Sequence, residues 1–312
     1  MKHSGHAIVH FNRMMIKFRY PYILVVPVIL VLAATGFIFY KASNTYKKDI
    51  PLSHEQELKV TINAGYGDIY LSRGNGATLL HANIDAELKH DIDDYVEYSS
   101  RDNIGYLNIC TSDENYKSNN EHNHSIHFNG FGTNTWDMHF TDAIPISYDV
   151  ELGVGKADFD FSGLSIKDLN LSTGASSVDM RFDKRNRSVI EDMNIESGVS
   201  KFHAEGLCNA NFSHLKFQGG VGSYELDFGG KLDREANVDI EVGLGSLTVI
   251  IPEHIGAKIE YEKSIIAHIS LADDFSEQEQ NTYYSANYYD APGKLNMHIE
   301  AGLGSVKIRR QP

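Results

Sequence analysis

Cysteine is scarce in this sequence of 312 residues, which contains only Cys110 and Cys208. No Cys-x-x-Cys motif is present, so thiol redox catalysis is not expected. The two thiols could pair as a disulfide if their domain lies outside the cytoplasm, but nothing in the sequence shows that their Cβ atoms can approach each other. Two buried, unpaired thiols are an equally good interpretation.

The signature motifs of common enzymes are also missing. The sequence has no Gly-x-Ser-x-Gly nucleophile elbow, no phosphate-binding loop and no His-Glu-x-x-His metal motif. Its Gly-x-Gly segments are weak as dinucleotide-binding signals, because no helix is predicted after any of them. We therefore expect no catalytic residues and no cofactor.

Basic residues are few relative to acidic ones, with 28 Lys and Arg against 42 Asp and Glu and a formal net charge of −14. Residues 1–48 contain seven of the basic residues and no acid. Residues 49–312 therefore hold 21 basic and 42 acidic residues, which gives them a net charge of −21. The phosphates of a nucleic acid would be repelled by such a domain, so we expect no nucleic-acid partner.

Long hydrophobic runs are absent except at residues 20–40, where 21 uncharged residues lie between Arg19 and Lys41. A helix of that length crosses the hydrocarbon core of a membrane. We expect a short cytoplasmic tail at residues 1–19, one transmembrane helix at 20–40 and a polar tether at 41–54. The alternative is a cleaved signal peptide, but the charged segment before the run is long for one.

The orientation of this helix follows from the basic residues beside it. Four basic residues precede the apolar run and three follow it closely, so the bias toward a cytoplasmic N-terminus is modest. The rest of the chain has no second span, and we expect it to be translocated. The predicted location is the cytoplasmic membrane, with the large domain outside it.

Glycine recurs at a nearly fixed interval through the remainder of the chain. Two alternating apolar residues are followed by a glycine, by Gly or Ser two positions later, and by two more alternating apolar residues. In the central five copies the leading glycines lie 21, 24, 22 and 23 residues apart, and one further copy lies on each side. These leading glycines are Gly65, Gly153, Gly174, Gly198, Gly220, Gly243 and Gly302.

This period predicts an all-β fold made of repeated units. Alternation on both sides of each glycine is typical of half-buried strands, and glycine suits the sharp corner between them. A unit of about 22 residues cannot bury its own apolar face, but stacked units enclose a continuous core. We therefore expect a β-solenoid over residues 55–312. An antiparallel sandwich of hairpins uses the same alternation, yet it has no reason to repeat one corner at a fixed interval.

The leading glycine of each corner is expected to need a positive φ angle. On that interpretation, Gly243→Val should lower the free energy of unfolding by about 1–3 kcal/mol.

Two polar segments, residues 111–141 and 264–294, interrupt the repeats and are predicted to be inserts. The first contains the only metal candidates, His122, His124 and His127, which are weak because polar loops often contain histidine without a metal and no cysteine accompanies them. The second contains the tyrosines Tyr283, Tyr284, Tyr288 and Tyr289. These could form a recognition surface for a glycan or a protein, or they could cover the open end of the solenoid.

A row of acidic residues raises the alternative of a polysaccharide-active enzyme. The alternating outward positions beside the repeats carry Asp158, Asp160, Asp179, Glu225 and Asp227. The middle repeats place Lys201 and His203 at the equivalent positions, so the row is mixed in charge. We interpret it as a solvated face that keeps the domain soluble.

The repeat motif resembles a known family. The segments that begin at Val238 and Met297 read VDIEVGLGSLTV and MHIEAGLGSVKI, and they are similar to bacterial adhesin-like, or toast-rack, β-solenoid domains. They also resemble the C-terminal domain of LiaF-like cell-wall-stress proteins. The resemblance covers roughly residues 55–312 and implies an envelope setting, with attachment or stress sensing as the role.

Together these features predict a non-catalytic, membrane-anchored domain that interacts with an envelope protein or glycan. A purely structural module is a third alternative. It would be distinguished by a cellular role that survives deletion of residues 111–141 and 264–294.

Overall fold

The computed structural model describes residues 44–111, 133–262 and 267–312. The predicted tail and transmembrane helix, and the candidate metal ligands His122, His124 and His127, lie outside the described residues. Within the described part of the chain, no helix has the length and apolar character needed to cross a membrane.

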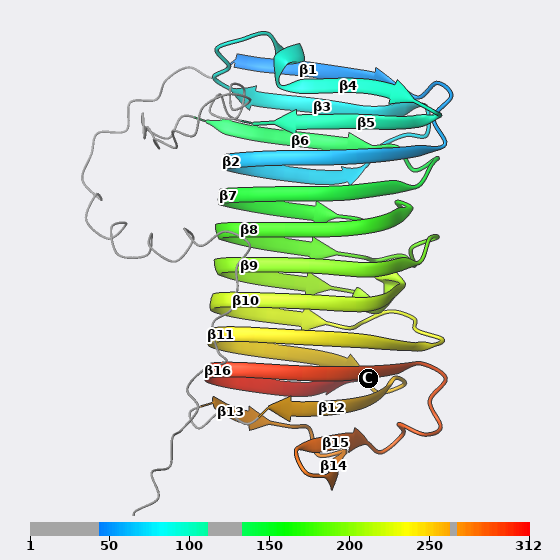
Figure 1. The fold of residues 1–312 in the computed structure, drawn as a ribbon, viewed down its shortest axis with the longest axis vertical. Helices are drawn as coiled ribbons and strands as arrows, with labels where there is room; N and C mark the ends of the chain where they lie inside the picture. Colours follow the sequence, from blue (N-terminus) through cyan, green and yellow to red (C-terminus); the bar gives the residue numbers. More distant parts are fainter. Residues whose placement is uncertain (1–43, 112–132, 263–266) are drawn as a thin grey trace, which may run out of the picture. The chain divides into compact units, whose positions relative to one another are not determined.

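The fold is an array of long parallel strands, as the glycine period predicts (Figure 1). Each strand turns over at one edge of the array, so that its two halves lie in two layers. Consecutive strands pair in parallel, which excludes the antiparallel sandwich. The strands are β2 (Glu57–Arg73), β7 (Ile146–Asp160), β8 (Ile166–Arg181), β9 (Ile190–Glu205), β10 (Phe212–Asp227), β11 (Glu235–Pro252) and β16 (Lys294–Gln311).

The register of these strands aligns equivalent residues of every repeat. Gly155 of β7 pairs with Ser176 of β8, and Gly222 of β10 pairs with Gly245 of β11. Alternate side chains point inward and form one continuous core, in which aromatic rings of successive strands meet. The ring centroids of Phe202 in β9 and Phe217 in β10, for example, lie 5.3 Å apart. Burial of each such ring contributes about 1.5–3 kcal/mol to stability.

Glycine occupies the two corner positions for two different physical reasons. The prediction that the leading glycine has a positive φ angle is wrong. Positive φ occurs at the second glycine of four corners, Gly67, Gly155, Gly245 and Gly304, and Gly245 has φ +139°. At five of the seven leading positions, glycine is instead needed for close approach between neighbouring strands. A Cβ on Gly302 would lie 2.5 Å from the carbonyl oxygen of Gly243 in the adjacent strand. The residue between the two glycines points outward, and Leu244 is 44% exposed.

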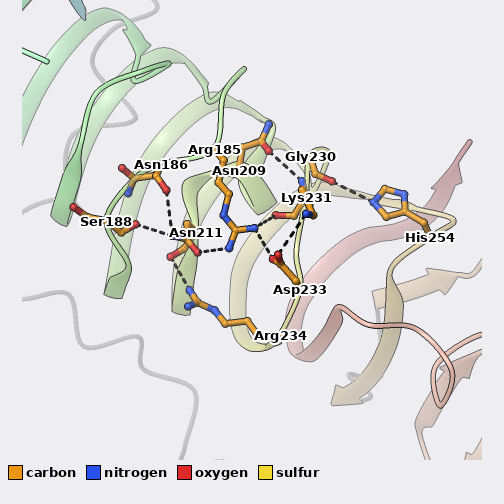
Figure 2. Close-up of polar contacts among 10 residues, drawn as sticks. All are labelled: Arg185, Asn186, Ser188, Asn209, Asn211, Gly230, Lys231, Asp233, Arg234 and His254. Atoms are coloured by element: carbon orange, nitrogen blue, oxygen red, sulfur yellow. Dashed lines mark hydrogen bonds and ion pairs between the residues drawn. The ribbon is translucent and has the colours of Figure 1, made fainter.

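The opposite edge of the array is closed by turns that side-chain amides hold together (Figure 2). Asn186, which is 3% exposed, accepts a hydrogen bond from Ile166 N at 2.8 Å and donates to Ala210 O at 3.1 Å. Asn211 repeats the arrangement by donating to Ser188 O at 2.8 Å. These amides satisfy buried backbone groups that the strand ladders leave without partners, so their role is structural.

Shorter strands cover the N-terminal end of the array. Strand β5 (Ile104–Cys110) pairs with the first half of β2, and β6 (Asn134–Phe140) pairs with its second half. Beyond them lie β3 (Thr78–Ala86), β1 (Asn44–Pro51) and β4 (Val96–Arg101).

Two sequence-based assignments at this end differ from the structure. Most of the expected tether is strand β1, which pairs antiparallel with β3. The end of the expected insert at residues 111–141 is strand β6, whose Trp136 is fully buried. Neither strand carries the repeat motif: both pair antiparallel with β3, and β6 pairs in parallel only with the second half of β2.

The C-terminal end is closed by a segment that leaves the array and returns. After β11 the chain forms β12 (Gly256–Glu262), β13 (Ala267–Ser270), β14 (Phe275–Glu279) and β15 (Thr282–Ser285). It then re-enters as β16, which lies between β11 and β12. The predicted insert at residues 264–294 thus contains three strands and forms the C-terminal cap, by which we mean residues 267–293.

Arg310 joins this cap to the array. Its side chain is 7% exposed and donates from Nη2 to the carbonyl oxygens of Glu253 and Ile255, both at 3.0 Å. The same nitrogen donates to Asn287 Oδ1 in the cap at 3.2 Å, and Nε lies 3.1 Å from Asp274 Oδ2.

Candidate binding groove

A groove of about 810 Å³ lies where the C-terminal cap meets the outer face of the strands. One wall consists of outward-pointing side chains from the first halves of β9, β10, β11, β16 and β12. The other wall consists of the cap tyrosines. The lining residues are Glu191, Asp192, Ser213, His214, Asn237, Asp239, Lys258, Glu260, Tyr284, Tyr288, Tyr289, Asn296, Met297 and His298.

The polar wall is built by the register of the parallel strands. Equivalent positions of successive strands carry the row Asp192, His214, Asn237, Asn296 and Lys258. Two residues further along, Asp239, His298 and Glu260 form a second row. Because neighbouring strands lie about 4.8 Å apart, each row presents a hydrogen-bonding group at that interval.

The aromatic wall is a cluster of three tyrosines. The rings of Tyr284 and Tyr289 stack with centroids 5.9 Å apart, and Tyr288 meets Tyr284 edge to face at 5.0 Å. Tyr284 is 9% exposed, whereas Tyr289 is 67% exposed. Thus Tyr284 covers the end of the solenoid, as one of the two sequence-based interpretations predicts, while Tyr289 presents its ring to solvent.

Tyr288 connects the two walls of the groove. Its hydroxyl donates to Asn296 Oδ1 at 2.8 Å, and the Lys294 ammonium lies 5.6 Å from its ring centroid. Burial raises the pKa of the Tyr288 phenol, so the hydroxyl stays protonated at neutral pH. The cluster is therefore held in place against the polar wall.

His214 lies between two carboxylates in the polar wall. Its Nε2 is 2.7 Å from Asp239 Oδ2, and its Nδ1 is 3.3 Å from Asp192 Oδ1. The hydrogen bond to Asp239 is the largest cause that raises the pKa of His214, and the hydrogen bond to Asp192 adds to it. Lys258 is likewise bonded to Glu260, which raises the pKa of the lysine. The groove thus contains charged groups that neutralise one another in part.

The groove combines an exposed aromatic surface with rows of amides, carboxylates and an imidazole. Such a combination can stack against one face of a ring and hydrogen-bond several hydroxyl groups at once. Sequence reasoning singled out the tyrosines but missed His214, Asn237 and Asn296. The repeat motif could have identified them, since each of these residues directly precedes the first apolar residue of its repeat and they occupy equivalent positions.

The acidic row on the second halves of the strands is interspersed with an arginine and a histidine. Arg181 binds both Asp158, at 3.0 Å, and Asp160, at 2.9 Å. His203 lies 3.4 Å from Asp179 and 3.6 Å from Glu225. This mixture of acidic and basic side chains, which the sequence predicts, argues against a row of catalytic carboxylates.

The two cysteines are unpaired, with Cys110 partly exposed and Cys208 buried. Burial raises the pKa of both thiols, which disfavours a reactive thiolate at neutral pH.

Comparisons with known proteins place this fold in a family. The sequence profile described as the N-terminal domain of toast_rack matches residues 39–204. The profile described as cell wall-active antibiotics response LiaF, C-terminal, matches residues 206–308. The chain belongs to the toast-rack family, which confirms the resemblance seen in the corner motifs. No curated protein matches the chain.

Solved structures of bacterial proteins are similar to this chain. A candidate cell adhesion protein from Clostridium sporogenes ATCC 15579 is 20% identical, with 86% of this chain and 100% of that chain covered and a TM-score of 0.42. A candidate adhesin from Bacteroides fragilis NCTC 9343 is 14% identical, with 85% and 97% covered and a TM-score of 0.30.

Proposed function

We propose that this chain is a non-catalytic binding domain of the bacterial envelope and that its groove holds a segment of a saccharide polymer. The observation that carries the proposal is the solvent-exposed ring of Tyr289 opposite two rows of hydrogen-bonding side chains. The apolar face of a sugar ring packs on an aromatic ring, and its hydroxyls bond to amides and carboxylates.

The charge of the groove favours one class of saccharide. Its lining contains four carboxylates, those of Glu191, Asp192, Asp239 and Glu260, and a single lysine that is bonded to one of them. The wider domain also has a large negative charge. Phosphorylated or carboxylated polymers would be repelled, whereas neutral or amino sugars would not. Polymers of N-acetylated amino sugars fit this requirement.

The family supports an envelope setting. The profile named for a response to cell wall-active antibiotics covers residues 206–308, which contain most of the groove lining. We propose that residues 20–40 anchor the chain in the cytoplasmic membrane and that the β-solenoid lies outside it. A domain so placed would report on, or attach to, the polymer that it binds.

The proposal is tested by titrating the full-length protein with a neutral N-acetylglucosamine oligomer, using isothermal calorimetry. Tyr289→Ala should weaken binding by about tenfold or more, since a stacked aromatic contributes about 1 kcal/mol beyond the area that it buries. The matched control is Tyr70→Ala, which removes another exposed tyrosine, on β2 and outside the groove. Asn296→Ala should weaken binding as well. No binding by the wild-type protein, or equal loss in both tyrosine variants, would overturn the proposal.

A further inference from the structure

A cluster of potential metal ligands on strands β16 and β12 adjoins the groove and shares His298 with its lining. Glu300 of β16 and Glu262 of β12 are directly opposite each other in the parallel register. His298 precedes Glu300 by two residues, so the two side chains project from the same face of β16. Three potential metal-binding side chains therefore meet on two adjacent strands.

The distances among these side chains suit a small dication. His298 Nε2 lies 3.2 Å from Glu300 Oε1, and one donor atom from each of the three residues lies within 4.8 Å of the others. Zinc binds nitrogen and oxygen at about 2.0–2.2 Å, so tetrahedral ligands lie roughly 3.4 Å apart. His298 and Glu300 are already close to that separation. Glu262 is exposed, and a change of its rotamer would bring its carboxylate into reach.

The charges around the cluster favour a cation. Glu241 of β11 is opposite Glu300 in the register, so three glutamates occupy consecutive strands. Like charges directly opposite one another destabilise a sheet. Among the described residues, Glu300 has an ion pair only with His298, and Glu262 has none. A bound dication would offset this repulsion.

Space for a metal ion and its water ligands is present at the same place. A pocket of about 390 Å³ opens beside the cluster, and its lining includes Glu262 and His298. Gln280 and Asn281 of the C-terminal cap also line this pocket. The ion would therefore bind at the junction between the array and its cap.

We propose that Glu262, His298 and Glu300 bind a dication of the zinc type, with water completing its coordination. One imidazole and two carboxylates suit zinc, whereas calcium and magnesium prefer oxygen ligands only. The ion would join β12 to β16 and so stabilise the C-terminal end of the solenoid. This site requires no saccharide, so its test is independent of the proposed function.

The test is a titration of EDTA-treated, full-length protein with zinc chloride, in the absence of any saccharide. Because the chain contains other histidines, the readout is the difference between variants. His298→Ala should reduce the number of zinc ions bound per chain by one, and Glu262→Gln should weaken that site at least tenfold. The matched control is His203→Ala, since His203 also lies near two carboxylates but outside this cluster.

A second readout is thermal stability. Zinc should raise the melting temperature of the wild-type protein and of His203→Ala, whereas it should leave that of His298→Ala unchanged. Calcium at the same concentration should have no effect on any of them. Equal zinc stoichiometry in wild-type and His298→Ala protein would assign the ions to other surface histidines only and overturn the proposal. Equal stabilisation of both by zinc would do the same.

Discussion

The corner of the repeat offers the sharpest test of how this fold is specified, through the substitution Gly245→Ala. Gly245 has φ +139°, a conformation that residues with a side chain rarely adopt. A Cβ on this residue would also lie 1.8 Å from the carbonyl oxygen of Gly222 in the neighbouring strand. Neither problem is relieved by a side-chain rotation, because the obstructing atom belongs to the backbone of a paired strand.

The expected loss can be estimated from these two effects. Backbone strain of this kind costs about 1–3 kcal/mol, and overpacking costs about 1–3 kcal/mol more. The sum, roughly 2–6 kcal/mol, is a large part of the 5–15 kcal/mol by which domains are typically stable. For a domain of this size each kcal/mol corresponds to about 2–4 °C, so the melting temperature should fall by roughly 4–24 °C.

The assay is thermal unfolding of the full-length protein, followed by circular dichroism. The matched control is Gly76→Ala in a turn, where an added Cβ would lie 3.4 Å from Asp142 Oδ1, an ordinary contact, and no positive φ is required. We expect Gly76→Ala to change the free energy of unfolding by less than about 1 kcal/mol. Equal melting temperatures for the two variants would refute the role assigned to the second corner glycine.

Three further predictions concern groups beside the core, the cap and the groove. Arg310→Ala should lower the free energy of unfolding by about 3 kcal/mol and expose the cap to proteolysis, because it removes three hydrogen bonds. The control Arg309→Ala, at an exposed residue, should change neither the free energy of unfolding nor the proteolysis of the cap. Tyr148→Phe should raise the melting temperature slightly. The buried Tyr148 hydroxyl has no hydrogen-bond partner in the described structure, so its removal ends a desolvation cost of about 1 kcal/mol. A lower melting temperature for the variant would contradict this prediction. The raised pKa of His214 means that its contribution to stability is complete below its unfolded pKa of about 6.5 and is lost as the pH rises through the folded value. The difference in unfolding free energy between the wild type and His214→Gln should therefore be larger at pH 5.5 than at pH 9. The same difference at both pH values would refute this role of His214.

The central strands could be predicted from the sequence because each repeat carries its own pairing information. A parallel solenoid places equivalent residues side by side, so a period in the sequence is also a register in space. The difference between the two corner glycines could not be read in this way. Gly243 and Gly245 look alike in sequence, but only the second has a positive φ, which depends on how the chain turns between the two layers.

The ends of the array were less predictable, because their strands pair outside the repeat. Strand β6 lies in a stretch that reads as a polar loop, although Trp136 within it is fully buried. Strand β16 inserts between β11 and β12, and the sequence patterns of these three strands do not indicate that pairing. The groove depends on that pairing, since it brings Asn296 and His298 beneath the tyrosines of the cap.

The most direct test of the account is the location of the β-solenoid in cells that produce the full-length protein with an epitope tag after Pro312. Protease is added to intact cells, to spheroplasts and to lysed membranes, and the tag is followed by immunoblot. The tagged domain should be digested once the outer barrier is breached, while the cytoplasmic membrane is still intact. Protection until that membrane is lysed would place the groove in the cytoplasm, away from any envelope polymer, and would contradict the proposed function.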